Sequence, residues 1–174
     1  MSADRPVTPA SRRGCWWIVF VLVTLTLCGG GTGAGLLSLA AEPNQIRTML
    51  TPARVEVTAG ESFELTLTIE NVSLDTVRIT GVGLDGSLRD AVRLERLEPA
   101  YRTVRIRNYP LLGEWTEYTF DRQVFAGDEL TVTLTLTALR PGPVSGDVLV
   151  WVQDRLLGLS FERARRELLT VDIR

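Results

Sequence analysis

Carboxylates are the side chains of this sequence best suited to chemistry, since Asp and Glu can act as general acids and bases or bind calcium. The chain has no His, the usual general base near neutral pH, and no Lys for a Schiff base or a phosphate loop. The spacing of the acidic residues matches neither a calcium loop nor a hydrolase pair. We therefore expect no enzyme activity, no metal site and no cofactor. The calcium candidates considered are Asp85, Asp90, Asp121 and Asp128.

Aromatic side chains gather in one irregular stretch, where they could bind a partner instead of catalysing a reaction. Exposed aromatic residues on loops often mark interaction surfaces. The alternative is that these rings plug one open end of a β-sandwich. We take residues 99–125 as the candidate contact region, with Tyr101, Tyr109, Trp115, Tyr118 and Phe120 as its interaction residues.

All 19 basic residues are arginines. Six of them lie between residues 89 and 107, where Asp90, Glu95 and Glu98 are interspersed. This mixture favours an ion-paired, solvated face over a site for anions. From Glu42 onward, 16 arginines are set against 20 acidic residues, which leaves four net negative charges. A negative domain repels phosphate backbones, so we expect no nucleic-acid partner.

A hydrophobic run near the N-terminus could hold such a domain at a membrane. The run carries no charge and would extend about 37 Å as a helix, which exceeds the roughly 30 Å of a bilayer core. Arg12 and Arg13 precede it and Glu42 follows it, so the positive-inside rule places the N-terminus in the cytoplasm. We expect a cytoplasmic tail over residues 1–14 and a single transmembrane signal anchor over residues 15–40, in the cell membrane, with the remaining chain outside the cytoplasm.

Two other interpretations of this segment stay open. Ser38-Leu39-Ala40 resembles the small-residue site of a cleaved secretory signal. Cys28 could be the lipidated residue of a lipoprotein, although Leu27 occupies a position that normally takes a small residue. Two overlapping G-x-x-x-G patterns also predict close packing of transmembrane helices, with a flexible stretch as the alternative. Their glycines are Gly29 with Gly33, and Gly31 with Gly35.

After a linker at residues 41–52 the sequence changes to a period of two. Phe63, Leu65 and Leu67 alternate with polar residues, and residues 130–138 alternate with threonines in the same way. This period predicts half-buried strands of antiparallel sheets. About seven to nine short strands, with turn signals roughly every 8–12 residues, predict an all-β, immunoglobulin-like (Ig-like) β-sandwich over residues 53–174.

The stretch from residue 156 to residue 169 fits the strand pattern poorly. Leu157, Phe161, Ala164 and Leu168 recur at nearly helical spacing. We expect a short helix or turn before the last strand, and a hairpin arm is the alternative.

Two runs of residues resemble a known class of domain. They are Ala59-Gly60-Glu61 through the alternating strand to Asn71-Val72-Ser73, and Ala126-Gly127-Asp128-Glu129 with the strand after it. Both resemble bacterial and archaeal extracytoplasmic Ig-like domains of the CARDB type (cell-adhesion-related) and similar domains of unknown function. The resemblance covers roughly residues 53–153 and implies a sandwich fold without catalytic residues. Asn71-Val72-Ser73 is also an N-glycosylation sequon, which in a strand turn predicts no function by itself.

These patterns together predict a membrane-anchored, extracytoplasmic Ig-like domain that acts as a non-enzymatic protein-interaction module. Its expected partners are the membrane, through the single span, and another protein of the cell envelope. The alternative function is a secreted or lipid-anchored module that binds a ligand, or a carbohydrate in a calcium-dependent way.

Overall fold

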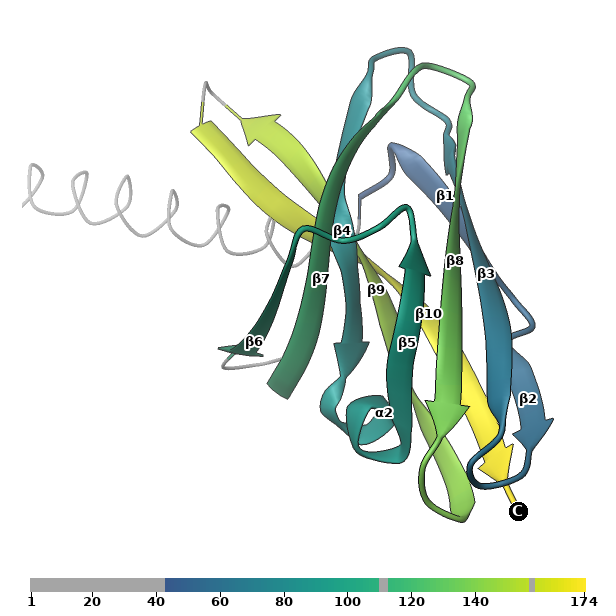
Figure 1. Cartoon of the computed structure of the whole chain (residues 1–174). Coiled ribbons are helices and arrows are strands. Elements are labelled where there is room, and N and C mark those ends of the chain that lie inside the picture. Colours follow the sequence, from purple (N-terminus) through teal and green to yellow (C-terminus); the bar gives the residue numbers. More distant parts are fainter. Residues whose placement is uncertain (1–42, 110–112, 157–158) are drawn as a thin grey trace, which may run out of the picture. The chain divides into compact units, whose positions relative to one another are not determined.

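The computed structural model describes residues 43–109, 113–156 and 159–174. In these residues two β-sheets pack face to face, and one short helix lies at the end of the sandwich (Figure 1). The elements in chain order are β1 (Ile46–Thr51), β2 (Arg54–Val57), β3 (Ser62–Asn71), β4 (Val77–Asp85), α2 (Gly86–Ala91), β5 (Val92–Glu98), β6 (Thr103–Tyr109), β7 (Gly113–Val124), β8 (Glu129–Ala138), β9 (Gly142–Leu156) and β10 (Leu159–Ile173).

The smaller sheet has four antiparallel strands in the order β1-β3-β8-β5. Strands β3 and β8 form its centre, and their register places Leu65 opposite Leu134 and Leu67 opposite Val132. These four side chains are fully buried. The alternation of apolar residues with threonine and glutamate therefore turns one face of each strand into the core and leaves the other to solvent.

The larger sheet has six strands in the order β2-β10-β9-β4-β7-β6. Neighbouring strands are antiparallel except for β2, which runs parallel to β10 and pairs Arg54 with Thr170. The register between β4 and its two neighbours shifts between Ile79 and Gly81. Gly81 lies so close to β7 that an added Cβ would be 2.4 Å from the carbonyl oxygen of Tyr118. No residue larger than glycine fits there without moving the backbone of β7.

The strand order confirms the predicted Ig-like β-sandwich. Strands β1, β3, β8 and β5 follow the A-B-E-D order of an Ig sheet, and β10, β9 and β4 follow the G-F-C order of its partner. Strands β7 and β6 extend the second sheet beyond β4, where a variable-type Ig domain has its C′ and C″ strands. In this chain the two strands come after β5, the D strand, instead of before it. With β2 they raise the number of strands in the described residues above the predicted seven to nine.

Strand β9 is buried on both of its faces. Val148, Val150 and Val152 point into the main core between the sheets. Leu149 and Trp151 point to the opposite side and form a second apolar cluster with Trp115 of β7. The six-stranded sheet thus has apolar packing on both sides near its centre.

Three local features differ from what the sequence predicts. Strand β1 (Ile46–Thr51) pairs with β3 inside the span predicted as a linker, residues 41–52, so the sandwich begins before residue 53. Residues 159–173 form strand β10, which pairs along its whole length with β9, so the hairpin alternative is right and the helix or turn is wrong. The alternating contacts of this long ladder outweigh the helical spacing of its apolar residues. Helix α2 was not predicted. Asp85 caps it and accepts a hydrogen bond from Leu88 N at 2.8 Å. The side chain of Leu88 is buried in the main core.

The predicted tail (1–14), anchor (15–40) and glycine pairs, together with Cys28, lie outside the described residues. In the part of the chain from residue 43 onward that the structure describes, no helix is long and apolar enough to cross a membrane.

Candidate functional site

Strand β6 forms an outer edge of the six-stranded sheet and extends past the four-stranded sheet that covers the rest of the core (Figure 1). Its cross-strand partners show which way its side chains point. Val104 lies opposite Tyr118, and Tyr118 packs on the core, so Val104 and Ile106 are on the core-facing side. They nevertheless remain 45% and 63% exposed. The six-stranded sheet is wider than its partner, and its last strand is left uncovered.

Two tyrosines continue this apolar surface. Tyr101, in the connection before β6, meets Tyr118 edge to face, with ring centroids 5.4 Å apart and an interplanar angle of 67°. Burial, and to a lesser extent the neighbouring Tyr101, raise the pKa of Tyr118 above its ordinary value. Tyr118 is therefore the inner, half-buried part of the surface and Tyr101 its exposed rim. We call Tyr101, Val104, Ile106 and Tyr118 the β6 overhang.

The opposite face of β6 is cationic. Thr103, Arg105 and Arg107 alternate with the apolar residues and lie on the outer side of the sheet. Arg107 forms an ion pair with the buried Glu117, its Nε 2.8 Å from Oε2. Arg105 lies directly opposite Glu117 in the ladder but forms no ion pair among the described residues. Two arginines thus share one carboxylate on this face, which leaves positive charge for a molecule bound beside β6.

The backbone of β6 adds a third kind of contact. In an antiparallel ladder, an edge strand turns every second pair of N–H and C=O groups away from its neighbour. Strand β6 has only β7 as a neighbour in the described chain. Hydrogen-bonding groups, apolar side chains and a positive charge therefore occur together along one short strand.

The structure divides the predicted interaction residues into separate groups. Trp115 and Phe120 are 2% and 1% exposed, and they point to opposite faces of β7 into the two apolar clusters. They cannot form part of a surface patch in this structure. Tyr101 and Tyr118 stay together in the overhang, and the side chain of Tyr109 lies outside what the structure describes. That the 99–125 stretch binds a partner stays a prediction.

Val104 and Ile106 were missed as surface residues. Their alternation with Arg105 and Arg107 is visible in the sequence and correctly indicates a strand. The signal that could have marked an edge is the pair of arginines on one face, since charged side chains are common on edge strands.

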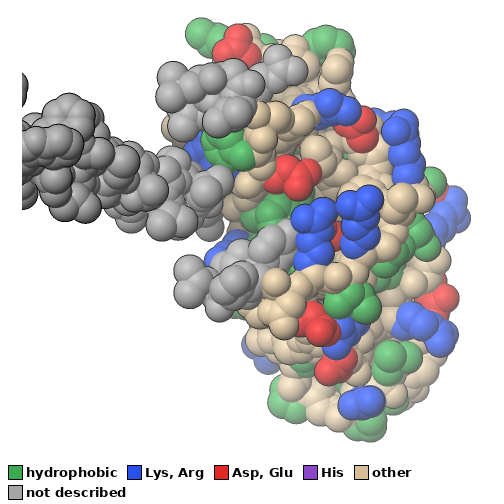
Figure 2. Space-filling view, turned by 90° about the vertical axis from the view of Figure 1, so that its left-hand side faces the viewer, with side chains coloured by type: hydrophobic (Ala, Val, Ile, Leu, Met, Phe, Trp, Pro, Cys, Tyr) green, Lys and Arg blue, Asp and Glu red, His purple; other side chains and the backbone are tan. Residues whose placement is uncertain are grey.

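The wider arginine cluster is largely neutralised, as its mixed charges predicted. Arg89 pairs with Asp90 and Glu114, Arg93 with Glu95, and Arg96 with Glu98. Figure 2, which looks onto the β6 side of the domain, shows Arg and acidic side chains interspersed, with separate hydrophobic patches between them. Surface ion pairs of this kind contribute little to stability.

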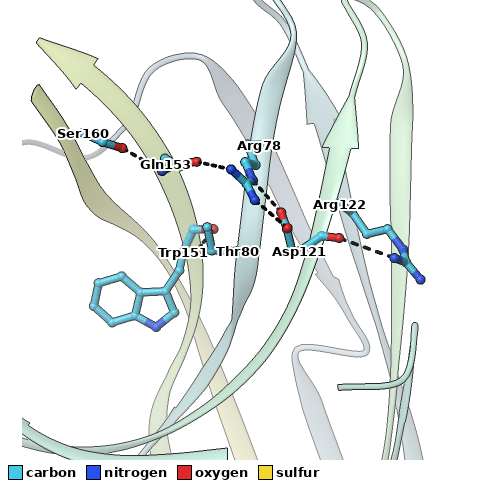
Figure 3. Close-up of polar contacts among 7 residues, drawn as sticks. All are labelled: Arg78, Thr80, Asp121, Arg122, Trp151, Gln153 and Ser160. Atoms are coloured by element: carbon cyan, nitrogen blue, oxygen red, sulfur yellow. Dashed lines mark hydrogen bonds and ion pairs between the residues drawn. The ribbon is translucent and has the colours of Figure 1, made fainter. Parts of the chain in front are cut away.

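A polar network crosses the six-stranded sheet at another place (Figure 3). Arg78 of β4 holds the carboxylate of Asp121 with two hydrogen bonds and donates from Nη1 to Gln153 Oε1 at 3.0 Å. Gln153 Nε2 then donates to Ser160 Oγ at 2.6 Å. The hydrogen bond from Arg78 lowers the pKa of Asp121, whose backbone has a φ of 64°. Asp121 therefore has a structural role in fixing β7 against β4.

Next to this network lies a polar pocket of about 600 Å³ at the end of the sandwich. Asp154, on its wall, is almost buried and pairs with Arg163. Amides, hydroxyls, two carboxylates and one guanidinium supply the polar contacts of the pocket. It is lined by Gln45, Ser73, Asp75, Thr76, Val77, Arg78, Gln123, Gln153 and Asp154.

The four calcium candidates do not come together. Asp85 caps α2 and also accepts from Asp147 N at 2.9 Å, Asp90 pairs with Arg89, and Asp121 is held by Arg78. Asp128 lies in the β7–β8 turn. Within the described residues no group of three or more carboxylates or cysteines is placed to hold a metal ion.

The glycosylation sequon has a structural explanation. Asn71 is fully buried, and its Nδ2 donates to the carbonyl oxygens of Asp75 (2.7 Å) and Val124 (2.9 Å). Its Oδ1 accepts from both the backbone N–H and the hydroxyl of Ser73. A glycan on Nδ2 would remove these contacts, so Asn71-Val72-Ser73 serves here to organise two turns.

No protein-family model and no curated protein matches the sequence. Among solved structures, one similarity is to E. coli alpha-2-macroglobulin, with 14% identity, a TM-score of 0.49 and coverage of 76% of this chain but only 7% of that chain. A second is to a PapD-like domain of human CEP192, with 12% identity, a TM-score of 0.41 and coverage of 77% and 89%. A third is to a cohesin module from a Clostridium perfringens family 33 glycoside hydrolase, with 11% identity, a TM-score of 0.39 and coverage of 76% and 100%. All three TM-scores are below 0.5, and the Ig-like assignment of the chain comes from its own strand order.

Proposed function

We propose that the chain is a non-enzymatic protein-interaction module, tethered by residues 15–40 to the outer face of the cytoplasmic membrane, and that it binds another envelope protein through the β6 overhang. The observation that carries this proposal is the exposure of Val104 and Ile106 on the core-facing side of an edge strand. Apolar side chains in that position are stabilised when a partner covers them.

The state of the ionisable groups supports a binding role over a catalytic one. Glu117 and Asp154 are the buried carboxylates of the described residues, and each is paired with an arginine, as is the more exposed Asp121. The hydrogen bond from Arg78 lowers the pKa of Asp121, which makes that carboxylate poorly suited to donate a proton. The sequence has no His or Lys that could replace them.

Photocrosslinking at a single position tests the proposal. The full-length chain is expressed in its native membrane with p-benzoylphenylalanine at Ile106, and crosslinked species are identified by mass spectrometry. Control chains carry the same residue at Leu74, which is 97% exposed in the β3–β4 turn, or at Met49 of β1. We expect one envelope protein to be captured from position 106 and from neither control. Equal capture from all three positions would contradict the proposed surface.

The polar pocket favours a second candidate function, the binding of a small hydroxylated ligand. Its amide, hydroxyl and carboxylate groups are the kinds that orient sugars and similar molecules. A thermal-shift screen of soluble saccharides, with and without calcium, tests this candidate. A saccharide that stabilises the wild type but not the Gln123→Ala variant would support it. An absence of any shift up to roughly millimolar concentrations would remove it.

A further inference from the structure

We infer that the partner binds by adding an extended segment to β6 as a seventh strand of the larger sheet, and that this segment alternates acidic with apolar residues. The inference rests on the proposed function and specifies how the β6 overhang is used. It follows from the unpaired backbone groups of β6, from its two chemically different faces and from a comparison of its charges with those of edge strand β5.

The backbone defines the shape of the partner. The outward N–H and C=O groups of an edge strand are spaced to pair with an extended chain, and neither a helix nor a compact loop can match that spacing. Strand β6 runs from Thr103 to Tyr109, so a segment of about seven residues would cover it.

The two faces of β6 define the sequence of the partner. Val104 and Ile106 lie on the core-facing side, and a strand beside them places alternate side chains against that apolar surface. Arg105 and Arg107 lie on the outer side, where the intervening side chains of the partner would meet them. Opposite charges in neighbouring strands attract, so those intervening residues should be Glu or Asp.

A second copy of this chain fits β6 poorly. Antiparallel pairing of two β6 strands centred on Ile106 would place each Arg105 opposite an Arg107. Parallel pairing in register would place each arginine beside its equivalent. Like charges directly opposite one another are destabilising, so these arginines disfavour self-association and favour an acidic strand.

Strand β5, the edge of the smaller sheet on the same side, differs from β6 in the pairing of its arginines. Its arginines are already neutralised within the strand, where Arg93 Nε lies 2.8 Å from Glu95 Oε1 and Arg96 pairs with Glu98. An acidic segment would therefore gain little charge attraction at β5. Arg105 of β6 lies opposite Glu117, but Glu117 pairs with Arg107 and Arg105 forms no ion pair within the described chain. This difference provides a matched control.

The test uses the full-length chain in lipid nanodiscs and a capped, fluorescently labelled heptapeptide that alternates Glu with Val. Binding is followed by fluorescence anisotropy, and backbone protection of residues 103–109 by hydrogen exchange. Two further peptides have the same side chains but carry N-methyl groups on one or the other set of alternate amides, so that each can pair through only one of its edges. A fourth peptide has Arg in place of Glu.

We expect the first peptide to bind and to protect the backbone of β6. The peptide that is N-methylated on the edge that pairs with β6 should bind at least about tenfold more weakly, because several ladder hydrogen bonds are lost. Arg105→Gln should weaken binding about threefold to tenfold, whereas Arg93→Gln should change it less than about twofold. The Arg-containing peptide should not bind measurably. Raising the salt concentration should reduce the difference between the wild type and Arg105→Gln.

The inference is overturned if neither register of N-methylation weakens binding, or if Arg93→Gln and Arg105→Gln have equal effects. It is also overturned if the alternating peptide does not bind at about 1 mM. These failures are distinguishable from failure of the proposed function. Specific crosslinks at Ile106 without peptide binding mean that the overhang binds a protein in another way, whereas absence of specific crosslinks removes both.

Discussion

Strands β8 and β6 have the same alternating pattern and opposite surroundings. In β8, Val132 and Leu134 alternate with threonines and are fully buried, because β8 lies in the middle of its sheet and faces the other sheet. In β6, Val104 and Ile106 alternate with arginines and are about half exposed, because the four-stranded sheet does not reach that far. The period of a strand determines the face on which a side chain lies, and the width of the opposing sheet determines whether that face is covered.

The largest expected effect contrasts these two strands directly. Leu134→Ala should lower the free energy of unfolding by about 3 kcal/mol, since it removes a fully buried side chain and leaves a cavity. Ile106→Ala should lower it by less than about 1 kcal/mol, because the side chain is already 63% exposed. Urea denaturation followed by tryptophan fluorescence measures both. Similar losses for the two variants would mean that β6 is covered in solution.

A smaller effect tests whether β7, which carries β6, is fixed to the core by Asn71. Asn71→Ala leaves the carbonyl oxygens of Asp75 and Val124 without their donor, and Val124 ends β7. We expect a loss of about 2 kcal/mol in the free energy of unfolding. Ser73→Ala, which keeps the amide of Asn71, is the control and should cost less. If both variants are equally stable, the Asn71 amide is not what holds this end of β7.

The next effect is pH-dependent and concerns the Arg78–Asp121 pair, which joins β4 to β7. Arg78 holds the pKa of Asp121 below its ordinary 3.8, so this pair stabilises the folded chain above that pH and loses its contribution as the pH falls through the folded pKa. Asp121→Asn, a residue that tolerates a positive φ, should lower the stability at pH 6 by less than about 1 kcal/mol. The difference from wild type should shrink below about pH 3.8. Denaturation of both proteins across this range, with Asp90→Asn as an exposed control, measures it.

The smallest effect is within the overhang itself. Burial and Tyr101 raise the pKa of Tyr118 above 10.0, so the neutral phenol is favoured in the folded state and this stabilisation is lost as the pH rises through the folded pKa. Tyr101→Ala uncovers the ring and should lower the pKa of Tyr118 towards 10.0, with a change in stability below about 0.5 kcal/mol. Ultraviolet titration against a Tyr118→Phe reference follows it. An unchanged titration would show that the two rings do not meet in solution.

Much of the sandwich could be predicted from local pattern. The alternation in residues 62–71 and 129–138 identified the two central strands of the smaller sheet, and the residues after Gly142 gave β9. The first part of β10 was mistaken for a helix or turn because its apolar residues recur at nearly helical spacing, and only its long pairing with β9 shows that it is a strand. Helix α2 is six residues long, too short to show a helical period.

The candidate site was predicted only in its location. Residues 99–125 contain the overhang, but the sequence could not separate exposed from buried aromatics. Trp115 and Phe120 are buried on opposite faces because β7 has apolar clusters on both sides, and that depends on β9 arriving from a distant part of the chain. The exposure of Ile106 depends on which strands lie in the other sheet. Neither property can be read from neighbouring residues.

The parallel pairing of β2 with β10 has a consequence for the order in which the domain assembles. Strand β2 is synthesised early, but its neighbour in the sheet is β10, the last strand, and Arg54 lies beside Thr170. Strand β2 therefore has no neighbour in its sheet until β10 has been synthesised. Contacts between such distant residues form slowly because a long loop must first be closed. Because β10 lies between β2 and β9, a chain stalled during synthesis before β10 would leave the edges of both strands without their hydrogen-bonding partner. A chaperone or protease could distinguish such a chain from the finished domain by these exposed edges.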